Sequence, residues 1–311
     1  MGHADQGHRG RSASRWHPAE GLVRAELDVS GLTRSYWLAA APEQEAPLVV
    51  AVHGLGTSGK DMASFTGLAQ RGPAAGFAVV FPDAIGEIWD GERGLPGREG
   101  VDDAGFINAL LDKLVDDRTA RRGALFLVGL SNGALFVEHL ARHGLVAPTG
   151  IMLVAGTARL KSRREVPQPR VKCAVLSVQG TADPVMPFEG GRPGGKGIIG
   201  WLVKRRLQVA GGGGEDRSVV SAEEVARDWA RANELPPEPR FEPFPSSERG
   251  VHVARRTWSA PGQPPVVLYM LEGGGHGWPG GPQYLPAWLI GRVSRDFDAT
   301  KSFLEVARQL A

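Results

Sequence analysis

A serine between two glycines stands near the middle of the sequence, in Gly129-Leu130-Ser131-Asn132-Gly133. The apolar run Ala124–Val128 precedes this motif, and a helix-like stretch, Ala134–Leu140, follows it. A serine on a sharp turn between a strand and a helix projects its hydroxyl above the sheet, and glycine on both sides avoids a collision. The motif therefore predicts that Ser131 is a nucleophile. The alternative is an ordinary glycine–serine turn that does no chemistry.

A serine nucleophile needs a histidine that accepts its proton. Four histidines follow Ser131, and three of them lie on the helix that leaves the turn or inside a predicted strand: His139, His143 and His252. His276 instead follows the predicted strand Val266–Leu271, in a glycine-rich loop. Because ligand-facing residues gather at the carboxyl ends of strands in open α/β sheets, we predict His276 as the base.

The histidine in turn needs a carboxylate that orients it. The aspartates between the serine and the histidine are Asp183, Asp216 and Asp228. Asp216 lies in a glycine-rich stretch and Asp228 on a predicted helix, whereas Asp183 follows the predicted strand Cys173–Val178. Asp183 also precedes a proline, so its alternative role is to start a turn. Its place at the end of a strand predicts Asp183 as the acid.

A tetrahedral intermediate formed at the serine would need two hydrogen-bond donors. We predict the backbone N–H of Asn132, which opens a helix, and that of Leu55, which follows the predicted strand Leu48–Val52 in His53-Gly54-Leu55-Gly56. For His53 we prefer a buried structural role. Asp102 and Asp103 are interpreted as a helix cap and a loop anchor.

The elements that must position these residues follow an alternating pattern. Leu22–Val29 and Ser35–Ala40 predict an opening antiparallel hairpin. The further predicted strands are Leu48–Val52, Phe77–Phe81, Ala124–Val128, Ile151–Val154, Cys173–Val178, Val251–Thr257 and Val266–Leu271. The predicted helices include Asp61–Gln70, Asn132–His143, Ala222–Asn233 and Thr300–Gln309. This alternation predicts an α/β fold whose sheet is mostly parallel and covered by helices on both faces.

Five motifs also stand in the order of a known family: His53-Gly-Leu-Gly56, Val101-Asp-Asp-Ala-Gly-Phe106, Gly129-Leu-Ser-Asn-Gly133, Gln179-Gly-Thr-Ala-Asp-Pro-Val185 and Gly273-Gly-Gly-His-Gly-Trp-Pro-Gly280. From about Leu22 to the C-terminus the chain resembles the polyhydroxybutyrate depolymerase and feruloyl esterase group of α/β-hydrolase serine esterases. The resemblance implies an α/β-hydrolase fold, a triad of Ser131, Asp183 and His276, and Trp278 beside the substrate. It does not fix the substrate, which can be a polyester, a feruloyl ester, an acetyl sugar ester or a small ester.

The chemistry thus predicted is ester hydrolysis through an acyl-enzyme. An acyltransferase or a peptidase on the same fold would use the same triad, and a ligand-binding protein that kept the fold is the non-enzymatic alternative. Two further tryptophans are candidates for substrate contact. Trp89 follows a predicted strand, and a packed core position is an equal alternative for it. Trp201 lies in the glycine-rich insertion 190–217, which we interpret as a mobile flap, with a short packed helix or a partner surface as the alternatives.

Composition narrows the remaining classes. The chain has 311 residues, of which 42% are hydrophobic, which predicts one domain over residues 21–311 after a disordered segment, 1–20. The formal net charge is +2 and the basic residues are scattered, so we expect no nucleic-acid partner. No nucleotide-binding or metal-binding motif is present, which predicts that the enzyme needs no cofactor and no metal.

The sequence also carries hints about compartment. Cys173 is the single cysteine, so an intrachain disulfide is impossible. No apolar run predicts a membrane span, and no signal peptide is visible. Secreted members of the resembled group carry leaders and often disulfides. We therefore expect a cytoplasmic protein, or a secreted one if a leader precedes this sequence.

Overall fold

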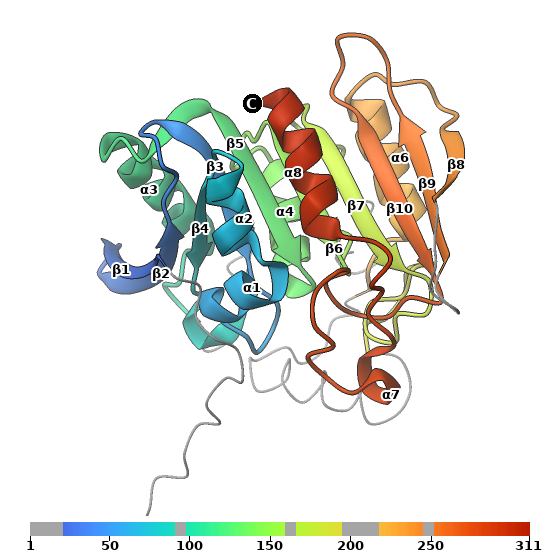
Figure 1. Cartoon of the computed structure of the whole chain (residues 1–311), viewed down its shortest axis with the longest axis horizontal. Helices are drawn as coiled ribbons and strands as arrows, with labels where there is room; N and C mark the ends of the chain where they lie inside the picture. The colour runs from blue at the N-terminus through green and yellow to red at the C-terminus, as the bar shows by residue number, and fades with distance from the viewer. Residues whose placement is uncertain (1–20, 91–97, 159–165, 195–217, 245–251) are drawn as a thin grey trace, which may run out of the picture.

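A computed structural model describes residues 21–90, 98–158, 166–194, 218–244 and 252–311 of the chain (Figure 1). The predicted disordered segment 1–20 lies outside the described residues. So does residue range 195–217, which holds Trp201, Asp216 and most of the predicted insertion.

Within the described residues, the strands form a ten-stranded sheet in the order β1-β2-β4-β3-β5-β6-β7-β10-β9-β8. Their bounds are β1 Leu22–Val29, β2 Leu32–Ala39, β3 Ala46–Val52, β4 Ala78–Pro82, β5 Ala120–Leu130, β6 Gly150–Val154, β7 Ala174–Gly180, β8 Arg240–Phe244, β9 His252–Trp258 and β10 Val266–Glu272. The six central strands, from β4 to β10, pair in parallel. The hairpin β1–β2 and the pair β9–β8 add antiparallel edges. The predicted sheet type and opening hairpin are confirmed.

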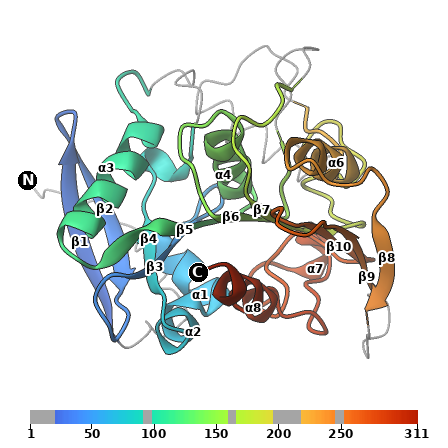
Figure 2. The ribbon, with the colours of Figure 1, turned by 90° about the horizontal axis from the view of Figure 1, so that it is seen from above.

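Helices cover both faces of the sheet (Figure 2). On one face lie α3 (Asp103–Asp116), α4 (Asn132–Arg142) and α6 (Ala222–Ala232); on the other lie α1 (Gly59–Thr66), α2 (Leu68–Ala74) and α8 (Ala299–Leu310). Two apolar cores result, the first with Phe106, Val137 and Trp229 and the second with Met62, Leu68 and Phe303. The central strands are buried on both faces, which explains their continuous apolar sequences. None of the described helices is long and apolar enough to cross a membrane.

Three local features differ from the prediction. The helix predicted over Asp61–Gln70 is divided into α1 and α2 at Gly67, whose left-handed φ of 64° ends the first helix. Strand β8 was not predicted, because its Pro243 weakens the strand signal; proline is tolerated there since β8 is an edge strand. The short helix α7 (Ala287–Ile290) was not predicted either.

The sheet order brings the predicted site loops together. Strands β3 and β5 are parallel neighbours, with Val52 paired to Gly129, so the loop after β3 emerges beside the serine turn. Strands β7 and β10 are also parallel neighbours, with Leu271 paired to Gly180. The loops that carry Asp183 and His276 therefore leave the same edge of the sheet, which is the edge where ligands bind in open α/β sheets.

Candidate active site

Ser131 occupies a sharp turn between β5 and α4. Its backbone has φ 56° and ψ −119°, a strained conformation for a residue with a side chain. The Ser131 N–H donates to the Val154 carbonyl at 2.9 Å, which ties the turn to β6. A Cβ at Gly129 would lie 2.6 Å from the Ala134 Cα, and one at Gly133 would lie 2.5 Å from the His53 carbonyl oxygen. Both flanking positions therefore require glycine, as predicted.

The predicted acid and base meet this serine. His276 Nε2 lies 2.9 Å from Ser131 Oγ, and His276 Nδ1 lies 2.8 Å from Asp183 Oδ2. Because a carboxylate can only accept, Nδ1 carries the imidazole proton and Nε2 is free to accept the serine proton. The serine is 8% exposed, the aspartate 8% and the histidine 5%, so the relay is largely shielded from water.

Backbone contacts fix both partners of the relay. The other oxygen of Asp183, Oδ1, accepts hydrogen bonds from the N–H groups of Val185 at 2.7 Å and Met186 at 2.8 Å. The His276 N–H donates to the Ile290 carbonyl at 2.5 Å, so α7 braces the histidine loop. These bonds hold the carboxylate and the imidazole in the orientation that the relay requires.

The loop after β3 packs against the serine. A Cβ at Gly54 would lie 3.5 Å from Ser131 Cβ, so the loop that contains Leu55 adjoins the nucleophile. Asn132 supplies the other predicted donor, as the first residue of α4. Both N–H groups thus belong to segments that adjoin Ser131, and their role as oxyanion donors remains a prediction.

His53 has the structural role that the sequence favoured. It is 1% exposed, its Nδ1 donates to the Gly54 carbonyl at 2.8 Å, and its Nε2 accepts from the Ala84 N–H at 3.1 Å. The bond from Ala84 requires an unprotonated Nε2, so the ring is neutral. Burial lowers the pKa of His53 below its ordinary value in agreement with this assignment.

Two tryptophans predicted to contact the substrate, Trp278 and Trp89, are buried in the structure. Trp278 is 1% exposed, and its Nε1 donates to Thr300 Oγ1 of α8 at 3.0 Å. Trp89 is also 1% exposed; its ring stacks on Phe136 and its Nε1 donates to the His53 carbonyl. Both indoles pack in the apolar cores, which is the alternative that the sequence left open for Trp89, and contact of either ring with the substrate remains a prediction.

The histidines and the aspartate that the sequence did not favour as base and acid lie apart from the relay. The tilted rings of His139, on α4, and His143, at its C-terminal end, lie 4.3 Å apart between centroids, and His252 begins β9. Asp228 forms ion pairs with Arg142 and Arg231 instead of with a histidine. The choice of Asp183 over Asp228 therefore agrees with the geometry.

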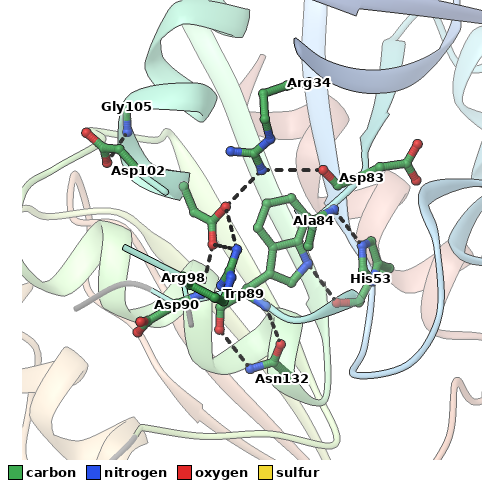
Figure 3. A network of polar contacts seen from close by, with 11 residues as sticks. Arg34, His53, Asp83, Ala84, Trp89, Asp90, Arg98, Asp102, Gly105 and Asn132 are labelled. Atoms are coloured by element: carbon green, nitrogen blue, oxygen red, sulfur yellow. Dashed lines mark hydrogen bonds and ion pairs between the residues drawn. The ribbon is translucent and has the colours of Figure 1, made fainter. Parts of the chain in front are cut away.

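A buried polar network beside the serine turn was missed by sequence reasoning (Figure 3). Asp102 caps α3 through a bond from the Gly105 N–H at 2.8 Å, as predicted. Asp103 binds Arg34 of β2 and Arg98 and accepts a bond from the Asp90 N–H. Arg34 stands 69 positions from Asp103 in the sequence, and no local pattern links the two. The one hint of this network in the sequence is Arg34 itself, a charged residue inside the otherwise half-buried strand β2.

Fold and site together define an α/β-hydrolase fold with a serine–histidine–aspartate relay at its carboxyl edge. The solved acetyl xylan esterase from Aspergillus awamori has this fold: it matches with a TM-score of 0.53 and 12% identity, over 82% of this chain and 94% of that one. A thermostable esterase matches with a TM-score of 0.43 and 16% identity over 62% of this chain, and the match spans about half (53%) of that esterase.

One relative is similar in sequence along most of the chain. It is named "Putative esterase NocK", from Nocardia uniformis subsp. tsuyamanensis, and is 28% identical over 291 residues. The match covers 90% of this chain and 80% of the relative. No family model matches the chain.

Proposed function

We propose that the chain is a serine carboxylic-ester hydrolase whose triad is Ser131, His276 and Asp183. The observation that carries this proposal is the continuous relay from Asp183 Oδ2 through both imidazole nitrogens to Ser131 Oγ, at 2.8 and 2.9 Å. A role in binding alone would not need three side chains aligned in this way. The similarity to a relative whose name designates an esterase supports esters as the substrates.

The geometry supports a two-step reaction. Ser131 Oγ attacks the ester carbonyl carbon while its proton passes to His276 Nε2, and Asp183 stabilises the imidazolium that forms. The N–H groups of Leu55 and Asn132 stabilise the negative oxygen of the tetrahedral intermediate. The intermediate then loses the alcohol, which takes the proton from His276, and leaves an acyl-serine. Water attacks this acyl-enzyme by the same route and releases the acid.

For the ester class, the sequence resemblance is the guide. We propose hydroxybutyrate oligomers, feruloyl esters and acetyl sugar esters as the first substrates to compare, with nitrophenyl esters of increasing acyl length beside them. An added acceptor alcohol separates transfer from hydrolysis, because an acyltransferase would form a new ester from it. A peptide substrate tests the peptidase alternative in the same assay.

The experiment compares the purified protein with two serine variants on this panel. Ser131→Ala removes the nucleophile, and Ser294→Ala is the matched control: Ser294 is 1% exposed, and its hydroxyl makes no hydrogen bond in the described part of the chain. We expect Ser294→Ala to match the wild type and Ser131→Ala to lose on the order of 10³-fold or more in kcat/KM. Full activity in Ser131→Ala would overturn the proposal.

A further inference from the structure

The side chain of Asn132 is fixed by the backbone of Trp89. Its Oδ1 accepts from the Trp89 N–H at 2.8 Å, and its Nδ2 donates to the Trp89 carbonyl at 3.2 Å (Figure 3). Asn132 is 5% exposed, so water does not compete strongly for either bond. Two bonds to one residue set both the position and the rotation of the amide. The same residue carries the proposed oxyanion donor on its backbone.

The Trp89 segment is itself held on three sides. The indole ring stacks on Phe136 of α4, with ring centroids 5.1 Å apart and an angle of 10° between the planes. Its Nε1 donates to the His53 carbonyl at 3.1 Å. The next residue, Asp90, donates its N–H to Asp103 Oδ2 at 2.9 Å. The third contact is the one that joins this segment to a charged group.

Asp103 is a fully buried carboxylate that the proposed reaction does not use. Its side chain is 0% exposed; Arg34 Nη2 lies 2.8 Å from Oδ1, and Arg98 Nη2 lies 3.1 Å from Oδ2. The Arg34 guanidinium also lies 4.0 Å from the centroid of the Phe106 ring. Burying such a group is costly and rarely adds net stability compared with apolar packing. A role in positioning the Trp89–Asp90 backbone would account for the buried Asp103 carboxylate.

We propose that Asp103 is a positioning residue for ester hydrolysis. It holds the Trp89–Asp90 backbone against the Asn132 side chain, and so fixes the direction of the Asn132 N–H that stabilises the oxyanion. The inference rests on the function proposed above. Its physical basis is that an oxyanion donor acts by being aimed before the reaction begins, so that a displacement of about 1 Å lowers the rate strongly.

Two substitutions break this chain of contacts at different links. Asn132→Ala removes the amide that grips Trp89 but keeps the backbone N–H. Asp103→Glu keeps the charge that pairs with the two arginines but moves the carboxylate away from the Asp90 N–H, and it avoids the unpaired arginines that would threaten folding in Asp103→Asn. Asp228→Glu is the matched control, because Asp228 is also a buried aspartate with two arginine partners but lies on α6.

The kinetic readout is the separation of kcat from KM on the best ester. For Asp103→Glu and Asn132→Ala we expect kcat to fall about 10-fold with KM within about twofold, because the lost contact acts on the transition state. The double variant should be scarcely slower than the slower single variant, because both act through one link. The control should keep its kcat within about twofold of the wild type. An unchanged kcat in Asp103→Glu would overturn the inference.

The second readout does not depend on activity. Hydrogen exchange measured by mass spectrometry should become faster, in Asp103→Glu, for the peptides that cover residues 85–90 and 129–136, and should not change there in the control. Unchanged exchange at 129–136 would show that Asp103 is not coupled to the serine turn, and would overturn the inference even if the wild type is an active esterase. A wild type without esterase activity would instead refute the proposed function, while the exchange result would still decide the coupling.

Discussion

Replacement of Asp183 by asparagine is expected to reduce kcat/KM about 10⁴-fold without disturbing the fold. The reason lies in the two backbone N–H groups, of Val185 and Met186, that donate to Asp183 Oδ1. In an asparagine only the carbonyl oxygen can accept these two bonds. The amide NH2 must then take the place of Oδ2, 2.8 Å from His276 Nδ1.

The reversed amide changes the tautomer of the histidine. Because NH2 is a donor, His276 Nδ1 must accept, and the imidazole proton moves to Nε2, where it faces Ser131 Oγ. A protonated Nε2 cannot accept the serine proton. The expected factor of about 10⁴ corresponds to about 5.4 kcal/mol of transition-state stabilisation.

The assay measures kcat/KM on the best ester for the wild type, Asp183→Asn and Asp228→Asn, with circular dichroism melting curves as the check on folding. Asp228→Asn is expected to stay within about threefold of the wild type in kcat/KM, because its partners are Arg142 and Arg231 and not the histidine. A loss of less than about 10-fold in Asp183→Asn would refute the reasoning about the tautomer. So would a larger loss in Asp228→Asn.

Two further predictions concern the frame around the serine. Gly133→Ala places a Cβ 2.5 Å from the His53 carbonyl oxygen, so urea unfolding should show a loss of at least about 2 kcal/mol, and an unchanged free energy of unfolding would contradict the packing of α4 on β3. His53 is buried and neutral, and its pKa is lowered, so below pH about 6.5 the unfolded chain binds a proton that the folded chain does not. Stability from this residue is therefore present above pH about 6.5 and is lost as the pH falls, by up to about 1.4 kcal/mol per pH unit. In the variant His53→Asn, where an amide replaces the ring, the free energy of unfolding should depend less steeply on pH between pH 7.5 and 5.5 than in the wild type. An equal slope in the two proteins would show that His53 is not the source of this pH dependence.

The features that sequence predicted best are those written in local patterns. The buried strands β3 and β5 follow from continuous apolar runs, and the serine turn follows from two glycines at fixed spacing. The positions of Asp183 and His276 at strand ends were enough to select them from several candidates, because parallel strands bring such ends to one edge. In the structure one imidazole nitrogen of His276 lies 2.8 Å from Asp183 Oδ2 and the other lies 2.9 Å from Ser131 Oγ.

What the sequence did not predict depends on contacts between distant segments. Trp278 stands two residues from His276, yet its indole turns onto Thr300 of α8, a direction that no spacing rule gives. The network around Asp103 depends on Arg34, which belongs to β2 and stands 69 positions away in the sequence. Gly67 divides a predicted helix because it adopts a left-handed conformation, and glycine within a helical pattern does not by itself require this.

The most direct test of the central claim, that Ser131 is the nucleophile of an esterase, is the site of covalent modification by a fluorophosphonate. The protein is treated with the reagent, digested, and mapped by mass spectrometry, with Ser131→Ala and His276→Ala in parallel. We predict a single adduct in the peptide that holds Ser131, no adduct in Ser131→Ala, and much slower labelling in His276→Ala, because the relay activates the hydroxyl. Labelling at another serine, or no labelling in a protein that hydrolyses esters, would contradict the account.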